Sequence, residues 1–257
     1  MIPVIPWYIT VLIVGVNVAI AGAVWRILAT AADRSGLVPT AARRVRVGSA
    51  IFLFGWLGAA LVLGPAPGSI AGRDPFYLTP LLPLFALGSS IVVLAAIGFS
   101  PAFRRALGAV SLPAVHGVQL YRVLGVIFLV LMARGQVPGH FALPAGWGDL
   151  AVGLAAPLVA IALARRAEGS RNVAVGWNVF GLVDLAVAVG MGTGYLTPLL
   201  APHLGSAVPP AAAMGVFPMI LVPTFAVPVS IMLHIVGITR LTAGARIGVE
   251  PLPRGAA

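Results

Sequence analysis

Cysteine and lysine are both absent from this chain of 257 residues. The absence of cysteine excludes disulfides, thiolate metal sites and cysteine nucleophiles. The absence of lysine excludes a Schiff base to retinal or pyridoxal phosphate, and also the lysine of a Walker phosphate-binding loop. The sequence also lacks the Gly-x-Ser-x-Gly, His-Glu-x-x-His and Asp-x-x-x-Asp patterns of common hydrolases and magnesium sites. These absences favour a non-catalytic protein without a metal centre.

Charged residues are scarce: they make up 9% of the chain, whereas 60% of the residues are hydrophobic. A soluble domain has roughly 25% charged residues because its surface faces water. With a mean hydropathy of +1.06, this chain must expose most of its exterior to lipid. We therefore predict an all-α integral membrane protein whose residues 1–257 form a single transmembrane domain.

Seven apolar runs each approach the ~20 residues that a helix needs to cross the hydrocarbon core of a bilayer. Trp7, Tyr8 and Trp25 mark the two ends of the first run, as interfacial aromatic residues do. The runs predict a polytopic bundle with transmembrane helices at about 5–25, 47–65, 80–99, 113–133, 147–164, 174–193 and 215–238.

The sixteen basic residues are all arginine, and their positions predict the orientation of the helices. If the seven helices alternate in direction, one side of the membrane receives only Arg73 and Arg134. The positive-inside rule then places the N-terminus outside and the C-terminus in the cytoplasm. Because the charge is spread over short loops, it predicts contact with lipid headgroups and not with nucleic acid. The arginines predicted to be cytoplasmic are Arg26, Arg34, Arg43, Arg44, Arg46, Arg104, Arg105, Arg165, Arg166, Arg171, Arg240, Arg246 and Arg254.

Two ionisable residues fall near the middle of predicted helices, Arg122 in the fourth and Asp184 in the sixth. Such a residue costs about 2.5 to 3.5 kcal/mol at the centre of a membrane helix unless a partner compensates for it. Both lie about 15 Å from the cytoplasmic face at the helical rise of about 1.5 Å per residue, so we expect them to form an ion pair. Two interpretations are open: a structural pair that fixes helix packing, and a gate or proton-linked site.

Further polar residues are expected at two other depths. His116, Gln119, Asn178 and His234 lie nearer the predicted cytoplasmic face, where they line one pocket if their helices are neighbours. Asp149, at the start of the fifth predicted helix, is expected close to the outer face, roughly 10 Å from the depth of the central pair. Stacked together, these levels predict a polar track of the kind that carries protons or ions.

Three functions agree with these features. The first is a proton-linked transporter of a small solute or ion, because Pro218, Pro223 and Pro228 break the last helix as in transporters whose broken helices line a cavity. The second is a haem-binding electron carrier in which His116 and His234 hold the iron. The third is a non-catalytic sensor or accessory subunit whose helices pack against a partner chain.

The segments Phe141–Gly153, Trp177–Leu185 and Leu221–Pro228 resemble a group of uncharacterised bacterial integral membrane proteins. The resemblance covers roughly the C-terminal half of the chain. It implies a location in the bacterial inner membrane and implies no particular activity. The residues around Asp149 and Asp184 also share the pattern Gly-x-x-Asp-Leu-Ala-Val, which is too short to indicate an internal repeat.

Overall fold

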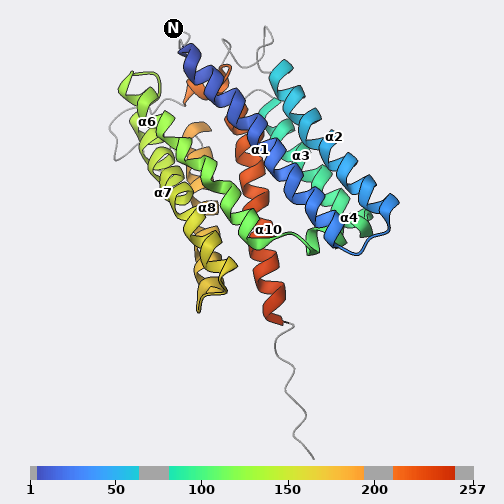
Figure 1. Cartoon of the computed structure of the whole chain (residues 1–257). Coiled ribbons are helices and arrows are strands. Elements are labelled where there is room, and N and C mark those ends of the chain that lie inside the picture. Colours follow the sequence, from blue (N-terminus) through green and yellow to red (C-terminus); the bar gives the residue numbers. More distant parts are fainter. Residues whose placement is uncertain (1–4, 64–80, 194–210, 247–257) are drawn as a thin grey trace, which may run out of the picture.

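The computed structural model describes residues 5–63, 81–193 and 211–246, and all regular secondary structure within these ranges is helical. Figure 1 shows the helices side by side in one bundle. In chain order the elements are α1 (Trp7–Arg34), α2 (Pro39–Leu63), α3 (Leu81–Phe99), α4 (Pro101–Gly108), α5 (Leu112–Gly117), η2 (Val118–Gly125), α6 (Val126–Ala133), α7 (Gly139–Ala164), α8 (Ser170–Thr193), η3 (Ala212–Gly215), η4 (Val222–Ala226) and α10 (Val227–Arg246).

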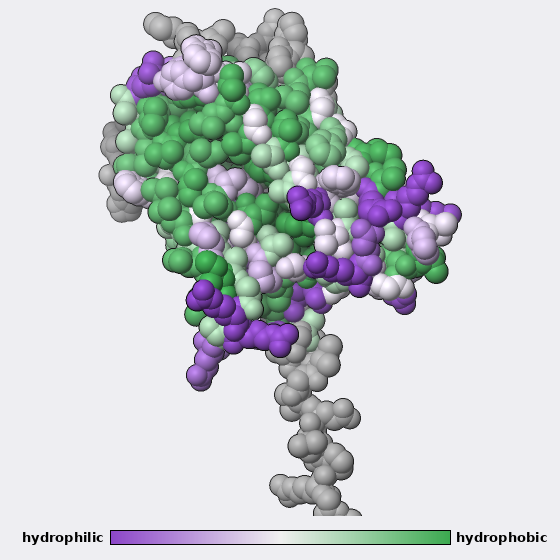
Figure 2. Space-filling view, in the orientation of Figure 1, coloured by the Kyte–Doolittle hydropathy of each residue, from purple (hydrophilic) through white to green (hydrophobic). Residues whose placement is uncertain are grey.

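Within the described residues, six segments are long and apolar enough to cross a membrane. They are α1, α2, the run from α5 through η2 to α6, α7, α8, and the run from η4 into α10. Gly88–Phe99 and Pro101–Gly108 make a seventh if they count as one span, although they are bent by 99° at the break between them. Figure 2 shows hydrophobic surface over most of the visible face. The fold fits a multi-pass integral membrane protein, as predicted.

The arginine-bearing turns gather at one end of the bundle. The start of α1 and the end of α10 lie at opposite ends (Figure 1), and the α1–α2 and α7–α8 turns lie with the end of α10. α4 joins them there, because Ala106 packs in a buried cluster with Ala32, Ala42 and Val45 of the hairpin. Figure 2 shows the hydrophilic residues concentrated at this end. Arg134 follows α6 at the other end, while Arg73 and Arg254 lie outside the described residues.

Several helices extend beyond their apolar runs. α1 continues to Arg34 instead of ending near residue 25, and α2 begins at Pro39 instead of near residue 47. α7 begins at Gly139, eight residues before the prediction, and α10 ends at Arg246, eight residues after it. A hydropathy run marks only the part of a helix that lies in hydrocarbon, whereas arginine is a good helix former and prolongs the helix into the interface.

The last span begins later than predicted, at Val222 instead of near residue 215, so Pro218 lies before it. Its first turn, η4, is a π-helix that contains Pro223, and Pro228 follows at the start of α10. Pro228 has no N–H to donate to the carbonyl of Thr224 one turn earlier. The indole N–H of Trp56 on α2 donates to that carbonyl instead, at 3.0 Å. The break is therefore satisfied by a neighbouring helix, as a bilayer requires.

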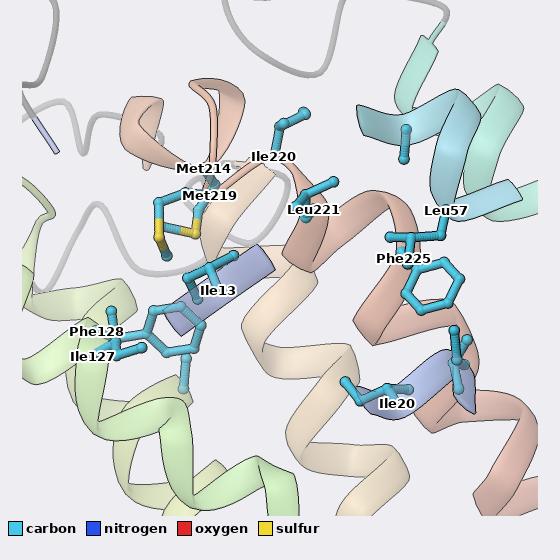
Figure 3. Packing of buried hydrophobic residues seen from close by; sticks show 14 of the residues in the cluster. Ile13, Ile20, Leu57, Ile127, Phe128, Met214, Met219, Ile220, Leu221 and Phe225 are labelled. Atoms are coloured by element: carbon cyan, nitrogen blue, oxygen red, sulfur yellow. The ribbon is translucent and has the colours of Figure 1, made fainter. Parts of the chain in front are cut away.

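The main hydrophobic core surrounds this π-helical turn. Figure 3 shows Ile13 and Ile20 of α1, Phe128 of α6 and Leu57 of α2 packed around Phe225 and the segment before it. Phe225 is fully buried, and its ring meets the Trp56 ring edge-on at 4.9 Å between centroids. The α1–α2 hairpin thus holds one side of the broken helix, which leaves its other side to α8 and the polar residues described next.

Candidate functional site

A buried guanidinium lies at the centre of the bundle. Arg122, on η2, is 3% exposed and contacts side chains from three other helices. Its Nε donates to Oδ1 of Asp149 on α7 at 2.6 Å, and its Nη2 donates to Oδ2 of Asp184 on α8. Its Nη1 donates to Nε2 of His234 on α10 at 3.0 Å. The predicted pair of Arg122 and Asp184 is confirmed as a contact, but it is one part of a larger cluster.

Asp149 lies at the depth of Asp184, not about 10 Å farther out as predicted. The reason is the early start of α7: Asp149 is the eleventh residue of a helix that begins at Gly139, so it sits about 15 Å along the helix. His234 is likewise deeper than predicted, because α10 continues for twelve residues beyond it, to Arg246. The separate polar levels expected from the sequence therefore meet at Arg122.

The cluster continues from His234 toward the arginine-rich end. Nδ1–H of His234 donates to Oδ1 of Asn178 at 2.9 Å, and Nδ2–H of Asn178 donates to Nε2 of His116 at 2.8 Å. Nδ1–H of His116 donates to the carbonyl of Leu112 at 2.7 Å, and the second amide hydrogen of Asn178 goes to the carbonyl of Ala174. This is the one pattern in which every donor meets an acceptor, and it makes both imidazoles neutral with the proton on Nδ1.

Gln119, the remaining predicted residue, does not join the cluster. It is fully buried on η2, and neither its amide nitrogen nor its amide oxygen has a hydrogen-bond partner among the described residues. Asn17 of α1, which the sequence reasoning missed, is also buried, and its Oδ1 has no such partner either. Asn17 stands out as the one carboxamide in the first apolar run, and that isolation was its available signal.

Glycines allow these side chains to approach the neighbouring backbone. A Cβ at Gly148 of α7 would overlap with the carboxylate of Asp184, and one at Gly181 of α8 would overlap with the ring of His234. Gly125 gives the same room to the Cβ of Asp149, and Gly237 lies against the carboxamide of Asn178, 2.8 Å from the Cβ position to Oδ1. Small residues let membrane helices pack closely, and here they make space for polar groups.

Two cavities meet at Asp149. The larger, of about 250 Å³, is lined by apolar residues such as Phe141 and Leu185, and Asp149 is the one charged group that the described residues place on its wall. It reaches Thr193, the last residue of α8, so it extends toward the arginine-poor end. The smaller, of about 60 Å³, is bordered by Asp149, Arg122 and Asn17. Its volume suits about two waters beside the unpaired oxygen of Asn17.

The formal charges of the cluster do not balance. Arg122 carries one positive charge, the two aspartates carry two negative charges when ionised, and the hydrogen-bond pattern leaves both histidines neutral. An uncompensated charge in a low-dielectric interior is costly. The arrangement is therefore suited to take up one proton, or one small cation, at the carboxylates.

The two histidines do not fit the predicted haem site. Nε2 of His116 accepts from Asn178 and Nε2 of His234 accepts from Arg122, so the iron-binding nitrogens are both occupied. A single carboxamide bridges the imidazoles, and the Trp177 ring lies 5.4 and 5.0 Å from their centroids, which leaves no space for a porphyrin between them. Among the described residues, no group of three or more His, Cys, Asp or Glu is placed to hold a metal ion.

A family model described as Domain of unknown function (DUF8737) matches residues 79–242, which are most of the chain. The chain belongs to this family. The matched region contains every residue of the Arg122 cluster, whereas α1 and α2, with Asn17 and Trp56, lie outside it. Comparison with curated proteins and with solved structures gives no match.

Proposed function

We propose that this member of the DUF8737 family is a proton-coupled transporter of small organic cations, with Asp149 as the shared binding site for proton and cation. The observation that carries the proposal is the position of Asp149. Among the residues that the structure describes, it is the one charged residue on the wall of the larger cavity, and it is bonded to Arg122 within a cluster that has one carboxylate in excess. Either a cation in the cavity or a proton can neutralise the excess carboxylate, so the two compete for Asp149.

The cavity favours a small cation with an apolar body. Its volume of about 250 Å³ is below the range of roughly 300–1,000 Å³ typical of drug-sized ligands. Phe128, Phe141 and Ile231 are among the apolar residues of its wall, and these suit alkyl groups next to a charged centre. A bare metal cation would find too few oxygen ligands there, since it needs several.

The broken helix supplies the movement that such a cycle requires. Pro223 and Pro228 line the same cavity; Pro223 lies within the π-helical turn η4, and Pro228 follows it in α10. π-helical turns and prolines are places where a helix bends easily, and transporters use broken helices at their binding sites. We infer that α10 swings about this turn, which would separate His234 from Asn178 and open the cluster toward the arginine-rich end.

The proposal includes a direction and a location. If the arginine-rich end is cytoplasmic, as the positive-inside rule predicts, the cavity opens toward the outside and the pair of Asn178 and His116 closes the inside. The N-terminus is then outside, the C-terminus is cytoplasmic, and the protein resides in the bacterial inner membrane. A reporter fused after Ala257 should be cytoplasmic.

Proteoliposomes test the transport proposal directly. Vesicles of phosphatidylethanolamine and phosphatidylglycerol are loaded with tetramethylammonium and a pH dye. Valinomycin with equal potassium on both sides clamps the membrane potential, and the vesicles are diluted into a potassium buffer without tetramethylammonium. Cation efflux should drive proton entry and acidify the interior. Asp149→Asn should abolish the acidification, because an amide neither binds a proton in this range nor attracts a cation.

Asp33→Asn is the matched control, because Asp33 is an exposed aspartate that pairs with Arg46 away from the cavity. It should acidify at the wild-type rate. Acidification that equals that of protein-free vesicles, with tetramethylammonium and with the larger tetraethylammonium, would overturn the proposal. Equal acidification by the wild type and Asp149→Asn would do so as well.

A further inference from the structure

We propose that the arginine-rich end of the bundle contains a second site, a pocket that binds an anionic phosphate group. The pocket has a volume of about 670 Å³ and is distinct from the cavities at Asp149. Its walls come from the α7–α8 turn, the first residues of α8, α10 and the connection between α4 and α5. Arg166 and Arg171, at the α7–α8 turn, and Arg240 of α10 line it.

The turn that carries Arg166 is not shaped for arginine. Arg166 has a φ of 51°, in the left-handed region that favours glycine, and Gly169 follows with a φ of 70°. A side chain in that region costs roughly 1–2 kcal/mol. The backbone therefore does not explain why this position is an arginine. Its place on the pocket wall, beside two further arginines, does.

The pocket offers donors that are directed and partly unused. Nε of Arg240 is buried and has no hydrogen-bond partner among the described residues. The guanidinium of Arg171 is anchored, because its Nη2 donates to the carbonyl of Leu241. Ser170 begins α8 and also lines the pocket, so the positive end of a long helix faces the same space. Arginine forks and helix N-termini are the groups that bind phosphate oxygens best.

One wall of the pocket favours a lipid as the source of the phosphate. Leu112, Pro113 and Leu163 are among its apolar residues, whereas Glu168, the acidic residue of the same turn, does not line it. An apolar wall beside three arginines suits a headgroup phosphate that continues into a glycerol backbone. Basic pockets between membrane helices bind anionic headgroups in this way.

Native mass spectrometry of the purified full-length protein tests the site. The protein is titrated with phosphatidylglycerol or with phosphatidylcholine in detergent, and bound lipid is counted. The wild type should retain phosphatidylglycerol in preference. Arg166→Gln and Arg240→Gln should each weaken its retention by about tenfold or more, as expected for the loss of a charge-assisted hydrogen bond.

Arg165→Gln and Arg43→Gln are the controls, since both remove an exposed arginine from the same end without touching the pocket wall. They should retain the lipid as the wild type does. If they weaken binding as much as Arg166→Gln does, the attraction is general and the site is refuted. Equal retention of the two lipids would exclude a lipid headgroup as the source of the phosphate. Arg166→Gln is the variant to compare with these controls, because the exposed Arg166 side chain can be replaced without loss of the hydrogen bond from Arg171 to Leu241.

Inorganic phosphate then distinguishes the two sources of the same chemistry. If millimolar phosphate raises the thermal stability of the wild type but not of Arg166→Gln, the site takes free phosphate. If phosphatidylglycerol binds and phosphate does not, the site takes a lipid headgroup. Binding of neither probe would overturn the proposal. Transport at Asp149 has no part in these measurements, so the two proposals stand or fall separately.

Discussion

The two halves of the buried polar cluster are built on different principles. In the half toward the arginine-poor end, the carboxylates of Asp149 and Asp184 share one guanidinium, and Asp149 borders a cavity. In the half toward the arginine-rich end, Asn178 joins two neutral imidazoles, and each hydrogen of its amide has an acceptor. The first half has a charge to exchange, whereas the second has its hydrogen bonds complete. A carboxamide does not release protons, so the second half holds the helices together, and in the proposed transporter it would close the route toward the arginine-rich end.

The largest effect is expected for Arg122→Gln, which leaves two buried carboxylates without their common cation. Breaking a buried ion pair from one side costs about 3–5 kcal/mol. We expect a large drop in the midpoint of thermal unfolding, measured by size-exclusion chromatography of heated detergent-solubilised protein. Arg134→Gln is the control, because Arg134 is exposed and its nearest hydrogen bond, to Tyr8, is long at 3.5 Å. Equal stability of the two variants would show that Arg122 does not organise the cluster.

Gly148→Ala should have the next largest effect. It disturbs the half of the cluster that contains the two carboxylates, and it does so through packing alone. The added Cβ would overlap with the Asp184 carboxylate, which must move away from Arg122. Overpacking of this kind costs about 1–3 kcal/mol. Gly176→Ala is the matched control, because a Cβ there meets nothing within 4 Å and alanine is the better helix former. A Gly148→Ala protein as stable as Gly176→Ala would contradict the tight placement of Asp184.

Hydropathy reveals a polar residue that interrupts an apolar run, but it does not reveal where a helix begins or which side chains meet. This limit explains which parts of the site could be predicted. The contact of Arg122 with Asp184 was predictable, because both residues interrupt long apolar runs and each needs a partner in lipid. The position of Asp149 was not, because Pro144 and three glycines precede it and resemble a loop, although Pro144 lies within α7. The role of Gly148 was hidden as well, since a glycine in sequence does not reveal which side chain occupies the space beside it.

Asn178→Leu tests the half of the cluster in which Asn178 joins the two imidazoles. It should lower the free energy of unfolding by less than Arg122→Gln does. Leucine is similar in size but leaves Nε2 of His116 and Nδ1 of His234 without their partner. An unsatisfied buried group costs about 1–3 kcal/mol, and no charge is left unpaired. Thermal unfolding should shift downward, while proton uptake at the carboxylates persists in the vesicle assay. Loss of proton entry with full stability would reverse the roles given to the two halves.

The smallest effect is expected for Asp149→Asn or Asp184→Asn alone. Each amide keeps an oxygen to accept from Arg122, and each change removes the excess negative charge, so either single variant should lie within about 0.5–1 kcal/mol of the wild type. The double variant leaves Arg122 as a buried cation without a carboxylate, and it should lose about 3–5 kcal/mol. Such non-additivity is the signature of one cation shared by two carboxylates, of which one is enough. If the two single losses instead add up to the loss of the double variant, both carboxylates are charged together, the cluster holds a second cation, and the excess charge on which the transport proposal depends does not exist.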